Sequence, residues 1–291
     1  MNYAIEINHL YKNYGQVQAV KDLTLQVEKG EFYGFIGPNG AGKSSTIRTL
    51  LGLISPTAGE AKVLGLPLAQ SCEYLKNVGY LPSEAMFYNN MTVKELISYS
   101  AKLRKTDCSQ RAQELCERLE LDVGKRIDEL SLGNRKKVGI VCAMQHNPQL
   151  FIMDEPTSGL DPLMQKEFFE LLHEEQRKGA TVFFSSHVLS EVKSHCTKAA
   201  IIRNGCLAAV DSIENLAKTN AKRITLQGVT EVPVELSAKS VVATQEGVSF
   251  LYQGEIKQLI AVLNQLPIKD MTLTEPDLDE IFMHYYEKEA K

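Results

Sequence analysis

The segment Gly37-Pro38-Asn39-Gly40-Ala41-Gly42-Lys43-Ser44 decides the fold of this 291-residue chain, because it matches the P-loop pattern G-x-x-x-x-G-K-[ST] in full. The apolar run Phe32 to Ile36 before it is typical of a buried strand, and a helical pattern follows from Ser44 to about Leu53. Glycines let successive backbone N–H groups turn toward one point, where the helix N-terminus adds partial positive charge. The segment therefore predicts a phosphate-binding loop, with Lys43 at the phosphates and Ser44 at a magnesium ion.

A second motif, Leu150 to Glu155, is an apolar run that ends in two acids. Such a run is typical of a strand buried on both faces. The Asp154 carboxylate suits magnesium, and Glu155 at the end of the strand suits a general base that polarises an attacking water. Because this run follows the P-loop along the chain, the two motifs together predict a site that hydrolyses a nucleotide.

The composition excludes several classes of protein. The chain is 44% apolar and 23% charged, as in ordinary globular proteins, and its formal net charge is −4. A nucleic-acid-binding protein usually carries a basic surface, so we expect no nucleic-acid partner. The sequence contains no run of 18 apolar residues and begins without a basic-then-apolar leader, which predicts neither a membrane span nor secretion. The scattered cysteines favour reduced thiols in a cytoplasmic protein.

The apolar pattern predicts the fold class α/β. We expect a P-loop NTPase core over residues 1–215, with an antiparallel β subdomain and a helical insert at about 80–145. A small C-terminal α+β extension is expected over residues 221–291, ending in a helix that begins near Pro276.

Two helix starts are specific enough to predict by residue. Thr92 and Glu95 have the spacing of a capping box, which places a helix over about 93–104. Asp161 followed by Pro162 is typical of an N-cap and a first helical position.

With these motifs in this order, residues 3–210 resemble the nucleotide-binding subunit of ABC transporters. The segment Leu130-Ser131-Leu132-Gly133-Asn134 stands where that family has its signature LSGGQ, from which Leu132 and Asn134 depart. Ser131 and Gly133 supply a hydroxyl and bare backbone N–H groups at a helix start, the chemistry that the signature needs.

The resemblance implies ATP and Mg²⁺ as ligands, and it implies a role for each motif. Catalysis is expected from Glu155, His187 and Lys43, with magnesium held by Ser44 and Asp154. The expected nucleotide-binding residues are Tyr14, Gly37, Pro38, Asn39, Gly40, Ala41, Gly42, Lys43, Ser44, Ser45, Ser131, Gly133 and Asp161. A core tyrosine is an equal alternative for Tyr14, and Asp161 also serves as a plain helix cap.

Two sequence features fit the family less simply. Ser83 stands where relatives have a glutamine that touches magnesium, and Glu84 or a bridging water are the alternatives for that contact. Arg135, Lys136 and Lys137 place cations in the first turn of the predicted signature helix, where they oppose its dipole. This favours an anion docking nearby, the alternative being a solvated basic face.

One P-loop and one signature predict a dimer, of this chain or with a sibling, because the family completes each ATP site between two subunits. The resemblance further implies a separate transmembrane permease and a position on the cytoplasmic face of the membrane. The segment Glu275 to Tyr286 is similar to the end of such subunits from drug and antibiotic exporters, so we expect export. The alternatives are a soluble ATPase of the same superfamily and a nucleotide-sensing module without a permease.

Overall fold

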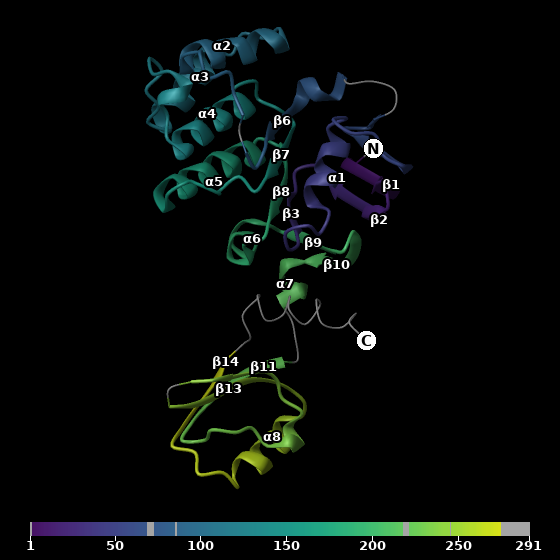
Figure 1. Cartoon of the computed structure of the whole chain (residues 1–291), viewed down its shortest axis with the longest axis vertical. Coiled ribbons are helices and arrows are strands. Elements are labelled where there is room, and N and C mark those ends of the chain that lie inside the picture. The colour runs from purple at the N-terminus through teal and green to yellow at the C-terminus, as the bar shows by residue number, and fades with distance from the viewer. Residues whose placement is uncertain (1, 69–72, 85, 218–220, 245, 275–291) are drawn as a thin grey trace. The chain divides into compact units, whose positions relative to one another are not determined.

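The computed structural model describes residues 2–68, 73–84, 86–217, 221–244 and 246–274. The chain divides into two compact units, Met1–Asp211 and Ser212–Lys291, and each is described by itself (Figure 1).

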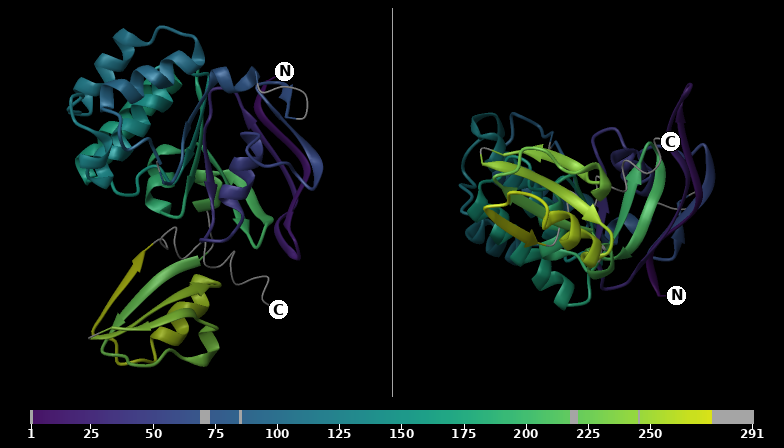
Figure 2. Two further views of the ribbon diagram at one scale, coloured as in Figure 1. Left: turned by 45° about the horizontal axis from the view of Figure 1, so that its top comes forward. Right: turned by 90° about the horizontal axis from the view of Figure 1, so that it is seen from below.

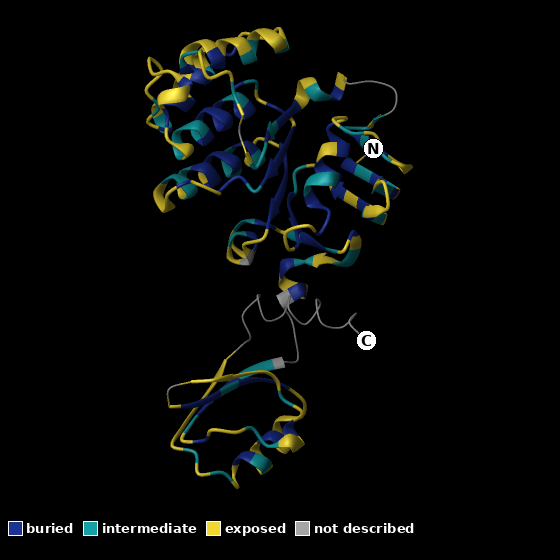
Figure 3. Ribbon diagram, in the orientation of Figure 1, coloured by how far each residue is buried: buried dark blue, intermediate teal, exposed yellow. Residues whose placement is uncertain are grey.

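A six-stranded sheet forms the centre of the first unit, with strand order β10-β9-β3-β8-β7-β6. The pairs β6/β7, β7/β8, β8/β3 and β3/β9 are parallel. All residues of β3, β7 and β8 are buried, as continuous apolar runs predict, and Figure 3 shows this centre in dark blue. The strands span β3 (Phe32–Ile36), β6 (Val78–Leu81), β7 (Leu150–Asp154), β8 (Thr181–Ser186), β9 (Lys198–Arg203) and β10 (Cys206–Ser212).

A second, antiparallel sheet has the strand order β2-β1-β4-β5. It shares a hydrophobic core with the central sheet, in which Ile5, Ile47 and Ile152 are fully buried. Helix α1 (Lys43–Leu50) contributes Ile47 to this core, which anchors the helix that begins at the P-loop. The strands are β1 (Tyr3–Tyr14), β2 (Val17–Glu28), β4 (Ala58–Val63) and β5 (Leu66–Pro67).

Helices dominate the segment between β6 and β7, as the sequence predicts (Figure 1). Helix α2 (Val93–Arg104) begins with the expected capping box between Thr92 and Glu95. The other elements of this segment are α3 (Ser109–Arg118), the short 3₁₀ turn Ile127–Glu129 and α4 (Leu132–Met144); the turn Glu73–Asn77 precedes β6.

The segment after β7 begins with a helix. Helix α5 (Pro162–Arg177) begins with Asp161 as its N-cap and Pro162 in its first turn, which confirms the predicted start. Helix α6 (Leu189–His195) follows β8, and α7 (Ile213–Ala217) follows β10. None of the helices in the described ranges is both long enough and apolar enough to cross a bilayer.

The second unit contains an antiparallel sheet of order β12-β13-β11-β14 and the helix α8 (Ile256–Leu263), visible in both views of Figure 2. Ile224, Phe250 and Leu259 are buried together in its core. Strand-like runs at 224–226, 241–243 and 248–252 and a helical pattern at about 255–265 predict the other strands and α8, whereas β14 was not predicted from the sequence. The strands are β11 (Ala221–Gln227), β12 (Lys239–Ala243), β13 (Gly247–Gln253) and β14 (Asp270–Thr274). The helix expected from Pro276, and the segment Glu275 to Tyr286, lie outside the described residues.

Candidate nucleotide site

The P-loop connects β3 to α1, and its backbone requires glycine. Gly40 and Gly42 have positive φ angles of 80° and 110°, which favour glycine over residues with a side chain. A Cβ at Gly42 would also collide with the backbone oxygen of Ala19. These constraints explain why the pattern of glycines marks this turn in the sequence.

A small cavity of about 150 Å³ lies against the loop. It is lined by P-loop residues together with Glu155, so two distant segments of the chain meet there. Its lining residues are Ala19, Asn39, Gly40, Ala41, Gly42, Lys43, Ser44, Ser45 and Glu155. The parallel order of β3, β7 and β8 accounts for this meeting, because the carboxyl ends of parallel strands share one edge of the sheet.

The Lys43 ammonium is buried within the P-loop. It donates hydrogen bonds to the carbonyl oxygens of Gly37 (2.6 Å) and Pro38 (3.2 Å). It also lies 3.2 Å from Oε1 of Glu155, an ion pair whose side chains are 5% and 22% exposed. A phosphate that enters the cavity therefore meets an ammonium already held in place by the loop's own backbone.

Glu155 follows β7 in the left-handed region, with φ at 46°. Its backbone N–H donates to the carbonyl and the hydroxyl of Ser185 in β8, at 3.1 and 3.2 Å. The Ser185 hydroxyl in turn donates to Oδ1 of Asp154 at 2.7 Å. Ser185 thus orients both acidic positions, a role that was not predicted, although a serine directly after the apolar run of β8 is a signal that could have identified it.

His187 follows β8 and is brought to the same place. Its Nδ1 lies 3.3 Å from Oε2 of Glu155, and its side chain is half exposed. The Glu155 carboxylate therefore has the Lys43 ammonium at one oxygen and the His187 ring at the other. The three residues expected to carry catalysis form one connected group in the structure.

The signature residues stand apart from this cavity. Ser131 is the N-cap of α4, and its hydroxyl accepts a hydrogen bond from the backbone N–H of Asn134 at 3.3 Å. Gly133 approaches the turn before α5, since a Cβ there would come within 2.9 Å of the backbone oxygen of Gly159. Neither Ser131 nor Gly133 lines the cavity beside the P-loop of its own chain.

Tyr14 and Asp161 also lie outside the cavity lining. Tyr14 ends β1, is 45% exposed, and has the ammonium of Lys12 5.0 Å above its ring. Asp161 accepts hydrogen bonds from the backbone N–H groups of Leu163 and Met164, at 3.1 and 3.0 Å. The exposed ring of Tyr14 differs from the core tyrosine that was the alternative interpretation, and Asp161 acts as a helix cap.

The basic first turn of α4 is not a uniformly solvated face. Lys136 is only 3% exposed and donates to three backbone carbonyls. Burial lowers the pKa of its ammonium to about 8, while the charges of Asp154 and Glu155 oppose that shift. Arg135 donates to the backbone oxygens of Ile127 and Asp128. Lys136 is therefore not part of a solvated face, and the negative charges that act on it are those of Asp154 and Glu155.

The loop, the acidic strand end and the connected group of Lys43, Glu155 and His187 are typical of a P-loop nucleoside triphosphatase. A family model described as ABC transporter matches residues 20–158. The chain is 33% identical to the bacitracin transport ATP-binding protein BcrA of Bacillus licheniformis, over 97% of each chain. It is 35% identical to the BcrA protein of Enterococcus faecalis, over 76% of this chain and 73% of that one.

A solved structure described as the ATP-binding subunit of an ABC transporter is 31% identical and superposes with a TM-score of 0.70, covering 73% of this chain and 91% of the other. The chain therefore belongs to the family of ABC transporter ATP-binding proteins. This membership confirms the predicted family, the α/β P-loop fold class and the expectation of an ATPase.

Proposed function

We propose that this chain binds ATP at the P-loop cavity, hydrolyses it, and thereby drives a separate membrane permease that exports a drug-like or antibiotic-like compound. The observation that carries the proposal is the contact of Lys43, Glu155 and His187 at one cavity beside the P-loop. The bacitracin transport proteins among the relatives support the kind of cargo.

The geometry supports a role for each of these residues. The P-loop amides and the Lys43 ammonium hold the β- and γ-phosphates of ATP. Glu155 accepts a proton from the attacking water, and His187 holds the Glu155 carboxylate and hydrogen-bonds the γ-phosphate. The carboxylate is suited to this task because Lys43 and His187 hold it from both sides.

Magnesium fits the donor set at this site. The Ser44 hydroxyl lies at the start of α1, and the Asp154 carboxylate is buried at the end of β7, so both offer the oxygen ligands that Mg²⁺ prefers. The Ser185 hydroxyl fixes the orientation of Asp154 from the side. Bound there, the ion would neutralise charge that develops on the phosphates.

A second ATPase subunit completes the site. Ser131 and Gly133 lie at the N-terminus of α4, and the Ser131 side chain is exposed outside the cavity of its own chain. A helix start with free N–H groups binds an anion, which here would be the γ-phosphate held by the partner's P-loop. Tyr14 would stack on the adenine, and Asp161 would lie at the interface between the subunits. The partner is an identical copy or a sibling chain.

The permease is a separate chain, and the ATPase docks on it at the cytoplasmic face of the membrane. No nucleic-acid partner is part of the proposal. The alternative functions, a soluble ATPase or a nucleotide sensor, differ in measurable ways. A sensor binds ATP without releasing phosphate, and a soluble ATPase co-purifies with no membrane protein.

The test is phosphate release by the purified full chain with Mg²⁺ and ATP, beside a Lys43→Ala variant. The Lys43→Ala protein is expected to bind ATP at least about tenfold more weakly, because it lacks the buried cation that contacts the phosphates. Wild-type affinity and turnover in that variant would refute the assigned site. Affinity purification from solubilised membranes is expected to recover a multi-spanning protein with the chain.

A further inference from the structure

Lys136 connects three segments that the proposed reaction uses. Its Nζ donates to the carbonyl oxygens of Pro82 at 3.0 Å, Ser83 at 2.8 Å and Glu155 at 3.3 Å. Lys136 itself belongs to α4, the helix capped by Ser131. One ammonium thus links the loop after β6, the turn after β7 and the helix that carries the signature.

The geometry uses the whole hydrogen-bonding capacity of the side chain. An ammonium has three N–H donors, and three carbonyls receive them. The residue is 3% exposed, so water competes little for these bonds, and hydrogen bonds from a charged donor are stronger than neutral ones. Leaving three partly buried carbonyls without a donor is correspondingly costly. The link therefore opposes independent movement of the three segments.

We propose that Lys136 is a positioning residue, which holds the Pro82–Ser83 loop, the Glu155 turn and the serine-capped helix as one mechanical unit. This inference rests on the proposed function. Ser83 takes part through its backbone carbonyl, so the link does not depend on a long side chain at position 83. A displacement of the Pro82–Ser83 loop is transmitted through the Lys136 ammonium to the Glu155 backbone. In the other direction, a shift of Glu155 when ATP enters the P-loop cavity is transmitted to that loop.

The test uses the absence of tryptophan from the sequence. A Met86→Trp substitution places a single reporter four residues beyond Pro82, at a side chain that is 90% exposed. In the full-length parent carrying this reporter, ATP is expected to change the tryptophan emission. The same protein then receives Lys136→Met, which keeps an unbranched side chain only one atom shorter and removes its donors. A matched Lys102→Met variant, at the exposed end of α2, serves as the control.

The Lys136→Met protein is expected to keep the Kd for a fluorescent ATP analogue within about threefold of the parent, while kcat falls roughly 10–100-fold because Glu155 is misplaced. The ATP-dependent change in emission should be lost, whereas the Lys102→Met protein should keep both signals. A Lys136→Met protein with parental kcat and emission change would overturn the proposal. A loss of ATP binding in proportion to a loss of thermal stability would also overturn the proposal, because Lys136 would then have only a structural role.

Lys136→Arg keeps a cation with several donors and serves as the second variant if Lys136→Met does not fold. It is expected to restore part of kcat and of the emission change, and a folded Lys136→Arg protein without an emission change would overturn the proposal. A parent that neither binds nor hydrolyses ATP would refute the proposed function instead, so the two failures are distinguishable.

Discussion

The ammonium of Lys43 and the carboxylate of Glu155 lie 3.2 Å apart, joining the P-loop to the end of β7. Both side chains are largely buried, so this contact lies in a region of reduced dielectric, where charges interact more strongly than in water. A phosphate that approaches Lys43 meets the Glu155 carboxylate beside it. Glu155 therefore both serves the expected chemistry and opposes the binding of the anionic substrate.

Replacing this charge separates the two effects. In a Glu155→Gln protein, kcat for ATP hydrolysis is expected to fall about 10²–10⁴-fold, because the amide does not accept a proton from water. The affinity for ATP should rise, since Lys43 loses its competing carboxylate and the γ-phosphate loses a like charge. Phosphate release and equilibrium ATP binding measure the two effects. With ATP, the variant should also sediment as a dimer, and unchanged turnover would contradict the catalytic role of Glu155.

His187 provides a second test of the same carboxylate. Its ring contacts Oε2 of Glu155 at 3.3 Å, and it is half exposed, so its removal should disturb the fold little. A His187→Ala protein is expected to lose roughly 10²-fold in kcat, with a smaller change in the affinity for ATP. His9→Ala is the control, because His9 is a 76% exposed histidine paired with Asp22. Equal turnover of the two variants would show that His187 takes no part in ATP hydrolysis.

The site was largely predictable where chemistry follows from consecutive residues. The P-loop pattern identifies Lys43, and the acidic end of an apolar run identifies Glu155, because each motif forms within one strand and the turn after it. The capping motifs at Thr92 and Asp161 were predictable for the same reason. Local sequence fixes these features through local hydrogen bonds.

The contacts that were not predictable join segments far apart in the chain. Lys136 is one of three consecutive basic residues, and nothing in that run shows which side chain turns inward. Its partners at positions 82, 83 and 155 are backbone carbonyls, which carry no sequence signal. Strand β14 was missed because its residues are exposed, so its place comes from pairing with β11 rather than from an apolar pattern.

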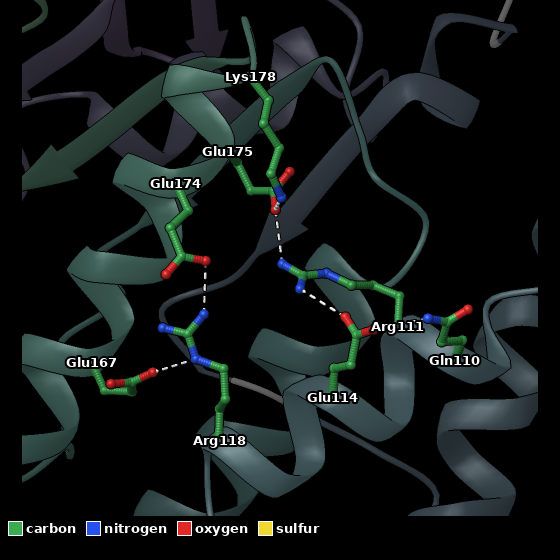
Figure 4. A network of polar contacts seen from close by, with 8 residues as sticks. All are labelled: Gln110, Arg111, Glu114, Arg118, Glu167, Glu174, Glu175 and Lys178. Atoms are coloured by element: carbon green, nitrogen blue, oxygen red, sulfur yellow. Dashed lines mark hydrogen bonds and ion pairs between the residues drawn. The ribbon is translucent and has the colours of Figure 1, made fainter.

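A network of ion pairs joins α3 to α5, as Figure 4 shows. Glu175 is 5% exposed, and its Oε1 receives Arg111 at 2.7 Å and Lys178 at 2.8 Å. Glu114 contacts the same Arg111 at 3.2 Å but is 47% exposed. Because the two acids share one partner and differ in burial, they form a matched pair.

Glu175→Ala is expected to lower the free energy of unfolding by roughly 3 kcal/mol, since it leaves Arg111 without its buried partner. Glu114→Ala is expected to cost less than about 1 kcal/mol, because its pair is exposed to solvent. Urea unfolding of both variants measures the difference. Equal losses in the two proteins would show that burial does not control the strength of this network.

His146 predicts how stability depends on pH. Burial lowers the pKa of its imidazole to about 4, with a smaller effect from the Arg104 charge, and its Nε2 contacts the Val78 carbonyl at 3.2 Å. In the unfolded chain the imidazole binds a proton near its ordinary pKa of about 6.5, so the unfolded state gains protons first as the pH falls. The free energy of unfolding should therefore decrease between about pH 6.5 and 4.

From pH 7.5 to 5, the wild-type protein is expected to lose about 2 kcal/mol more than a His146→Gln protein, whose side chain does not titrate. Urea unfolding at the two pH values measures this double difference, and parallel losses in both proteins would show that His146 is not the group responsible.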